Sequence, residues 1–368
     1  MANCHINYYL FYAIILKINK GKYSMEMIMA KSQEAISAYT LVRNLQKRFA
    51  DKLSALSTQI GEDKAFEEVV WFRDAGLHGG GSRFEARDAM LFNTASVNVS
   101  QVHYNEQPHR NLQSATAIST IIHPQNPNVP SLHMHISFTE VKDKPSYWRI
   151  MADLNPSIDN EEDKKIFDAK LQSLAGESYK EGTQQGNKYF NIPALNRTRG
   201  VSHFYLENYQ TQETQKDYDF ASAFGEGIID TYIDIISNAF QTRTSISEQA
   251  KRQQLEYHTL YLFQVLTLDR GTTSGLMIHN QNDVGIMGSL PTHIDPELLH
   301  SWASKVEAPQ DELVNALYAA VGEDGVIDVL TKMKLAQAVR DHYEAYPEAL
   351  SMQASGNTIP STVENHKL

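Results

Sequence analysis

The sequence predicts a single domain of the α+β class. Runs rich in β-branched and aromatic residues, interrupted by Gly and Pro, are concentrated between residues 66 and 149. Helical spacing of apolar residues precedes this region and dominates the chain after it. No internal repeat and no stretch rich in Pro, Gly or Ser divides the chain, so we expect these elements to share one fold.

The first expected element is an amphipathic helix over residues 32–60. Its apolar residues recur at steps of three and four, Ser32 is suited to cap its start, and Gly61 is suited to end it. Strand-like runs follow, namely VVWF, SVNVSQVHY, AISTIIH, HMHISF and SYWRIM. This half of the chain is therefore predicted to supply most of the sheet.

The second half is predicted to be mainly helical. We expect a polar-faced helix over 160–177 and longer helices over 218–240 and 244–263. A strand pair is expected around KYFNI and VSHFYLENY, and the run LYLFQVLTLDRG also has strand character.

From Asp295 onward the pattern is helical. One apolar face consists of Leu313, Val314, Leu317, Tyr318 and Val321 and ends at Gly322, and a second consists of Val329, Leu330, Met333 and Val339. We divide the chain into an extension of doubtful structure (1–30), the main domain (31–300), a helical C-terminal extension (301–349) and a disordered polar tail (350–368).

The composition excludes several functional classes. Of the 368 residues 42% are hydrophobic, which is enough for one large core. The net charge is −11 and the isoelectric point is near 5.7. A general binder of nucleic acid or of anionic membranes needs a dominant basic face, so this acidic balance argues against both classes. Cys4 is the only cysteine, so the sequence offers no disulfide framework, cysteine-ligated zinc or thiol catalysis, and it fits a reducing cytoplasm.

An apolar run, YYLFYAIIL, occupies residues 8–16. It is too short to cross a bilayer, which takes about 20 residues. No basic region precedes it and no clear small-residue cleavage site follows it. We therefore expect no membrane span, and we interpret residues 1–24 as a dispensable extension, with Met25, Met27 or Met29 as alternative starts.

A series of motifs singles out the centre of the chain. Residues 117–138 read AISTIIHPQNPNVPSLHMHISF, with a Ser, a His four positions later, a turn containing prolines, and a second His that opens an alternating run. The other motifs are HGGGSRFEARDAMLFNTASVNVSQVHY (78–104), ADLNP (152–156), LDRGTTSGL (268–276) and MGSLP (287–291). In order and spacing this series resembles the oxygen-dependent coproporphyrinogen-III oxidases, and we interpret the chain as a divergent member.

The resemblance implies a fold and a reaction. The fold is a large antiparallel β-sheet with helices packed on both faces. The reaction is the oxidative decarboxylation of coproporphyrinogen III, in which two propionates become vinyls and protoporphyrinogen IX is formed. The resemblance also implies a homodimer, O2 as co-substrate and no organic cofactor, and this chemistry has no clear need for a divalent metal.

Family positions that carry function match specific residues here. By resemblance, Ser119 contacts the substrate, His123 is a metal-ligand position and His133 is the proton donor. Asp153 matches the acid that the family places against the pyrrole nitrogens, where one carboxylate can accept several N–H groups and take up a pyrrole proton. His133 and His135 are two positions apart, so on a strand they share a face.

Three family arginines that hold substrate carboxylates are absent. Their positions are occupied by Ser137, Leu195 and Gln281. Because arginine is the natural bidentate partner of a carboxylate, we expect substitutes from the matched segments, which contain Arg83, Arg149, Arg197 and Arg199. We place His135, Ser137, Arg149 and Arg199 in the substrate site with Ser119.

The family's metal site is also incomplete. Its second and third histidines fall on Asp168 and Ala194, so a three-histidine site cannot form. His123 with Asp168 is a weak remaining ligand pair, and His135 or His203 are other partners for His123.

Each candidate residue has a structural alternative. His123 would only bond the turn that follows it, Asp153 would only form an Asx turn before Pro156, and His133, His135 and Arg149 would lie on a solvated strand face. Two rival functions stay open as well. One is a non-catalytic homologue that binds a tetrapyrrole or a partner subunit, and the other is a metal-dependent enzyme built on His133 and His135.

Overall fold

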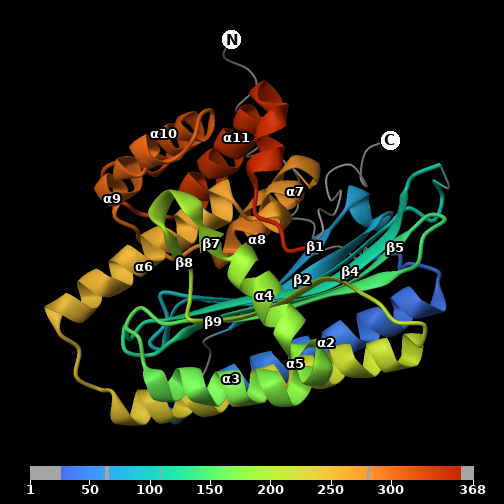
Figure 1. Cartoon of the computed structure of the whole chain (residues 1–368), viewed down its shortest axis with the longest axis horizontal. Coiled ribbons are helices and arrows are strands. Elements are labelled where there is room, and N and C mark those ends of the chain that lie inside the picture. Colours follow the sequence, from blue (N-terminus) through green and yellow to red (C-terminus); the bar gives the residue numbers. More distant parts are fainter. Residues whose placement is uncertain (1–25, 63–65, 108, 280–281, 358–368) are drawn as a thin grey trace, which may run out of the picture.

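The computed structural model describes residues 26–62, 66–107, 109–279 and 282–357 (Figure 1). Its centre is a seven-stranded antiparallel sheet of order β1-β2-β3-β4-β5-β6-β9, covered by helices on both faces. The predicted α+β class is therefore confirmed. The strands are β1 Glu67–Phe72, β2 Gly79–Arg87, β3 Phe92–His103, β4 Leu112–Pro124, β5 Ser131–Val141, β6 Tyr147–Asn155 and β9 Ser202–Tyr209.

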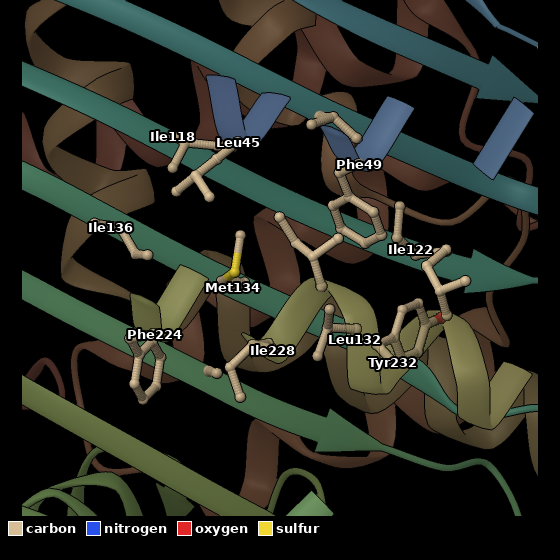
Figure 2. Close-up of a cluster of buried hydrophobic side chains, with 14 of the residues drawn as sticks. Leu45, Phe49, Ile118, Ile122, Leu132, Met134, Ile136, Phe224, Ile228 and Tyr232 are labelled. Atoms are coloured by element: carbon tan, nitrogen blue, oxygen red, sulfur yellow. The ribbon is translucent and has the colours of Figure 1, made fainter. Parts of the chain in front are cut away.

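One face of the sheet carries the larger hydrophobic core. It is covered by α2 (Gln33–Gln59), α3 (Glu161–Ala175) and α5 (Thr214–Thr242). Side chains of α2 and α5 meet the even-numbered side chains of β4 and β5, and the contacts include Leu45, Phe49, Phe224, Ile228, Ile118 and Met134 (Figure 2). The predicted helix over 32–60 is confirmed, and Ser32 caps it by accepting a hydrogen bond from the Ala35 N–H at 3.0 Å.

The opposite face is covered by the helices that follow α5. Their apolar side chains form a second core that includes Ile121 from the sheet. Because α10 and α11 share this core with α6, the C-terminal helices lie on the same side of the sheet as α6 (Figure 1). The helices are α6 Glu248–Thr267, α7 Arg270–Ile278, α8 Asp283–Ile286, α9 Pro296–Ser301, α10 Gln310–Val321 and α11 Val329–Ala345.

The predicted strand LYLFQVLTLDRG is wrong, because residues up to Thr267 continue α6. This part of α6 passes between the sheet and the outer helices and is buried on all sides. A helix that is buried all round has no polar face, so its apolar run cannot be distinguished from a buried strand by periodicity.

The predicted strand pair is half right. VSHFYLENY forms β9, but KYFNI begins at the end of α4 (Tyr179–Tyr189) and continues into the two-residue strand β7 (Asn191–Ile192). β7 pairs with β8 (Arg197–Thr198) and not with β9. α4 instead packs along β9, the edge strand of the large sheet.

The apolar face predicted for the last helix is also wrong. Val329, Leu330 and Met333 are 57%, 52% and 44% exposed, whereas Leu335 and Val339 are fully buried. The first turn of α11 therefore turns its apolar residues outward and buries Lys332 in their place, at 5% exposure.

Strand β2 has no run of β-branched residues because its first half requires glycine. A Cβ atom at Gly79, Gly80 or Gly81 would lie 2.0, 2.4 or 2.0 Å from a backbone oxygen of a neighbouring strand. Glycine thus allows the backbones of neighbouring strands to approach closely here, although in a sequence pattern glycine usually indicates an interruption of a strand.

The two ends of the described chain both pack against the fold. Ile28 donates its N–H to the Gly76 carbonyl (3.0 Å) and accepts a hydrogen bond from His103 Nε2 (2.9 Å). The expectations for residues 1–24 lie outside the described residues.

The predicted disordered tail is wrong for residues 350–357. Gln353 Nε2 donates to Thr273 Oγ1 (2.5 Å), and the Gly356 N–H donates to Glu207 Oε2 (3.0 Å).

Candidate functional site

One sheet face, which we call the polar face, carries the predicted site residues with the exception of Asp168 and of Arg199, which lies between β8 and β9. Side chains alternate along a strand, so the odd-numbered positions of β4, β5 and β6 point away from the larger core. The antiparallel register then places them in neighbouring rows, which are Ala117–Ser137–Arg149, Ser119–His135–Met151 and Ile121–His133–Asp153. His133 and His135 share a face, as predicted.

Asp153 is a fully buried carboxylate at 0% exposure. Its Oδ2 accepts hydrogen bonds from Arg199 Nη2 at 2.8 Å and from Asn155 Nδ2 at 2.6 Å. Burial alone would raise the pKa of Asp153, but the charges of Arg199 and His133 outweigh burial and lower this pKa below the usual range. Its Oδ1 is buried and accepts no hydrogen bond from any residue that the structure describes.

Arg199 is enclosed and does not reach solvent, at 1% exposure. Nη1 donates to Gln264 Oε1 at 2.6 Å, and the guanidinium lies 4.7 Å from the ring centre of Phe190 and 5.0 Å from that of Tyr261. The expectation that Arg199 binds a substrate carboxylate therefore does not fit its surroundings. It acts as the internal counter-ion of Asp153.

His133 lies between this ion pair and the solvent, with its side chain 13% exposed. Its Nδ1 is 3.0 Å from Asp153 Oδ1 but is not aligned with it for a hydrogen bond, and instead Arg199 Nη2 bonds Nδ1 at 3.0 Å. A nitrogen that accepts from arginine carries no proton, so neutral His133 has its proton on Nε2.

His135 and Arg149 line the more open part of the polar face, where both are partly exposed. Burial, reinforced by the charges of Arg149 and His133, lowers the pKa of His135 to about 3. His135 is therefore a neutral imidazole at physiological pH, able to accept or donate a hydrogen bond but not to supply a charge. Arg149 is the cation of this region, and its Nε has no acceptor among the residues described.

Ser119 and Ser137 complete this part of the polar face. Ser119 is partly exposed and stands opposite His135 in the sheet register. Ser137 is 7% exposed and stands opposite Arg149. Both hydroxyls thus lie beside the groups with which the sequence analysis associates them.

His123 is on the same face but is separated from the solvent. It is fully buried, its ring centre is 4.6 Å from that of Tyr261 and 5.3 Å from that of His258, and its Nδ1 lies 3.1 Å from Ser131 Oγ. Burial, with the neighbouring charge of His258, lowers the pKa of His123 well below the usual range.

The expected ligand pair of His123 and Asp168 is not formed. Asp168 lies on α3, on the other side of the sheet, where it bonds Ser202 and Lys164. Within the described ranges, no group of three or more His, Cys, Asp or Glu side chains is arranged to hold a metal ion. The metal-dependent function built on His133 and His135 gains no support.

Asp269 is a site residue that the sequence analysis quoted within a motif without giving it a role. It is 9% exposed, accepts from Tyr189 OH at 2.7 Å, and caps α7 through the Thr272 N–H at 2.7 Å. Although burial opposes ionisation, the Tyr189 and Thr272 bonds lower its pKa, with His133 a smaller contribution. The Asp-x-x-Thr spacing is typical of a helix N-cap, and this pattern could have identified Asp269 from the sequence.

The family model described as coproporphyrinogen III oxidase matches residues 37–321, more than half of the chain. The chain belongs to the coproporphyrinogen III oxidase family. The protein accordingly has a role in porphyrin biosynthesis, and the family acts on a porphyrinogen.

The match covers every candidate site residue described above. It also includes α10, which the sequence analysis places in the C-terminal extension, whereas α11 and Lys332 lie beyond it. No helix in the part of the chain that the structure describes is long and apolar enough to span a membrane.

Proposed function

We propose that this protein is an oxygen-dependent coproporphyrinogen III oxidase that forms protoporphyrinogen IX. Each of two propionates loses CO2 and a hydride equivalent to become a vinyl. The two hydride equivalents carry four electrons, which reduce one O2 to two waters with the uptake of two further protons. No organic cofactor takes part in this scheme.

The observation that carries the proposal is the state of Asp153. A buried, ionised carboxylate with one oxygen lacking a hydrogen-bond donor is costly to maintain. A porphyrinogen presents four pyrrole N–H groups toward its centre, and these donors match Oδ1, which lies 3.0 Å from His133 Nδ1 without accepting a hydrogen bond from it. Asp153 would thus anchor the macrocycle on the polar face.

The lowered pKa of Asp153 also indicates which residue binds the substrate and which transfers the proton. Because the pKa of Asp153 is lowered, this carboxylate is a weak base, so we assign proton transfer to His133, whose Nε2 proton faces away from Arg199. Arg199 holds Asp153 ionised and fixes the His133 tautomer, which makes it a positioning residue. Ser119 and neutral His135 would contact the substrate, and Arg149 would bind a substrate carboxylate.

The decisive experiment is turnover. The purified protein is incubated anaerobically with coproporphyrinogen III, air is admitted, and protoporphyrinogen is detected after oxidation to fluorescent protoporphyrin. His133→Gln should reduce turnover by about 10²–10⁴-fold, as expected for loss of a general acid–base group. His300→Gln, an exposed histidine on α9, is the matched control and should leave turnover unchanged. Wild-type protein that forms no product under these conditions would refute the oxidase proposal.

One observation favours a second candidate, a binding protein without turnover. Of the four arginines expected to replace the family's carboxylate partners, Arg199 is bound to Asp153 and Arg83 is 5% exposed and paired with Glu85. Arg197 is exposed on the small strand β8, which leaves Arg149 on the open part of the polar face. Tight binding of coproporphyrin without any conversion of coproporphyrinogen would favour this candidate.

A further inference from the structure

A small cavity of about 40 Å³ lies beside β1, at the edge of the sheet opposite β9. Trp71 and Arg73 line one side of it, and Ile278, His279 and Asn282 line the other. Pockets for whole drug-sized ligands usually begin at about 300 Å³. The cavity is therefore suited to one arm of a larger ligand, not to a complete tetrapyrrole.

Two buried donors in this cavity lack acceptors. Trp71 Nε1 and Arg73 Nε have no hydrogen-bond partner among the described residues, although Asp74 Oδ2 lies 3.7 Å from Arg73 Nε. Asp74 instead bonds His78 Nδ1 at 2.6 Å. A buried donor without a partner costs about 1–3 kcal/mol. A carboxylate, with two acceptor oxygens and a negative charge, would satisfy an indole N–H and a guanidinium N–H together.

Arg73 is held in place by its outer nitrogens. Nη2 donates to Tyr104 OH at 2.8 Å, and Nη1 contacts His279. The chain after Arg73 is strained, since Asp74 and Ala75 adopt φ angles of 48° and 58° in the left-handed region. The guanidinium is thus fixed before any ligand arrives, which reduces the entropy lost on binding.

A row of small side chains connects this cavity to Arg149. The row crosses the sheet through Gly81, Ser100, Ala117 and Ser137, and Ser100 and Ala117 are partly exposed. The indole N–H end of Trp71 lies over Gly81, where a Cβ would be 2.9 Å from Nε1. Four interstrand steps of about 4.8 Å separate β2 from β6, so the row spans about 19 Å.

We propose that Trp71 and Arg73 form a carboxylate subsite that binds one propionate arm of the tetrapyrrole, while Arg149 binds an arm on the opposite side. This inference rests on the proposed porphyrinogen substrate. It accounts for carboxylate binding in a chain whose Ser137, Leu195 and Gln281 replace the arginines of the resembled family. The row of small residues between the two cationic ends would leave room for the macrocycle.

The test measures binding separately from turnover. Coproporphyrin III, which carries four propionates and is not a substrate, is titrated against each variant and followed by its Soret absorbance. Trp71→Phe keeps the aromatic ring and removes the N–H donor, so affinity should fall about tenfold, as expected for one hydrogen bond to a charged group. Arg73→Lys keeps the charge, loses the fixed guanidinium geometry and should also weaken binding.

Two controls make the result specific. Trp148→Phe repeats the substitution in the core on the other face of the sheet and should leave affinity unchanged. Etioporphyrin carries ethyl groups in place of propionates, so its affinity should not respond to Trp71→Phe. Wild-type affinity for coproporphyrin III in Trp71→Phe, or an equal loss for both porphyrins, would overturn the subsite.

The outcome is independent of the oxidase proposal. If the wild type binds coproporphyrin III without converting coproporphyrinogen, and Trp71→Phe weakens this binding, the subsite stands and the oxidase proposal fails. If the wild type turns over and Trp71→Phe changes neither KM nor coproporphyrin affinity, the subsite fails alone. Absence of any coproporphyrin III binding by the wild type would overturn the subsite, whereas the oxidase proposal is decided by the turnover assay.

Discussion

At the residue scale, the guanidinium of Arg199 links the two groups on which the proposed chemistry depends. Its Nη2 bonds both Asp153 Oδ2 (2.8 Å) and His133 Nδ1 (3.0 Å). A change at Asp153 therefore affects three functions together: the acceptor for pyrrole N–H groups, the partner of a buried cation, and the environment of the proton donor. Mutants at this position must be measured for stability as well as for turnover.

For Asp153→Asn we expect a loss of turnover of about 10²-fold or more, because the neutral amide removes the anion that accepts pyrrole N–H groups. Stability should also fall, since Arg199 remains buried with a weaker partner, and breaking a buried pair costs about 3–5 kcal/mol. Steady-state kinetics and urea unfolding measure the two effects.

Asp230→Asn is the matched control for this substitution. It breaks an ion pair with Arg48 at 2.5 Å in which both side chains are 38% exposed. Surface pairs contribute about 0–1 kcal/mol, so both stability and turnover should remain near wild type. Wild-type turnover in Asp153→Asn itself would exclude the anchoring role.

For Arg149→Met we expect weaker substrate binding with little change in kcat. The side chain offers a carboxylate partner and no proton-transfer group, so KM and the Kd for coproporphyrin should rise by roughly tenfold or more. Arg197→Met is the control, because Arg197 is exposed on β8. Equal effects of the two substitutions would show that net charge, and not a specific contact, controls binding.

Strand alternation was sufficient to predict that His133 and His135 share a face, and motif resemblance was sufficient to place Ser119 and Asp153 near His133. Both depend on local spacing, which a sequence records directly. The position of Asp168 behind the sheet depends on how α3 packs, and the enclosure of Arg199 depends on Phe190 and Tyr261 from distant segments. Such packing joins segments that are distant in the chain, so the spacing of residues in a single sequence does not predict it.

At the element scale, α11 contains a buried lysine that makes stability depend on pH. Burial lowers the pKa of Lys332 to about 7, with nearby Arg87 contributing, whereas an unfolded lysine titrates near 10.4. Between these values the unfolded chain binds a proton that the native state does not, so the free energy of unfolding should rise with pH. The increase is about 1.4 kcal/mol per pH unit, or up to about 5 kcal/mol in total.

Lys332→Met should remove this dependence. We expect the variant to be more stable than the wild type at pH 7, with a difference that shrinks by about 1.4 kcal/mol per unit toward pH 10. Urea unfolding at pH 7, 8 and 9 measures it. Lys334→Met, at an exposed position of the same helix, should show a constant difference from the wild type. Parallel curves for Lys332→Met would mean that Lys332 stays charged in the native state.

The start of the described chain corrects the expectation for truncation. A chain that begins at Met29 lacks Ile28, which bonds both Gly76 and His103. We therefore expect a Met29 start to lose about 1–3 kcal/mol of stability, whereas a Met25 start should retain the melting temperature of the full chain. A lower melting temperature for the Met25 start would show that residues 1–24 contribute to the fold.

Elements with a clear periodicity were predicted well, and those without one were not. α2, with apolar residues on one side and a serine cap, begins one residue after the predicted start. The sequence patterns did not predict the end of α6 or the glycine-rich half of β2, and the reasons are opposite. α6 is apolar on all sides, and β2 replaces side chains with close backbone contacts. In both elements the residue types reflect tertiary packing, so a prediction from the local sequence pattern alone was wrong.

At the scale of the whole molecule, we expect a homodimer, as the family resemblance implies. Light scattering at micromolar concentration should give a mass of about twice the 41.6 kDa of the chain. The mass should stay constant on tenfold dilution if the interface is of the obligate size class. A mass near 41.6 kDa at micromolar concentration would contradict the dimer.

The bond between Gly356 and Glu207 has a consequence for how the protein is made. Its partners are 149 positions apart, and Ala354 packs beside it against Tyr189 and Tyr205. At about 5–20 residues per second, a ribosome needs roughly 7–30 s to pass from β9 to this segment. For that interval the aromatic surface at Tyr189 and Tyr205 has not yet been covered by the last segment of the chain. Chaperones that bind apolar surface therefore have a defined period in which to recognise the unfinished protein.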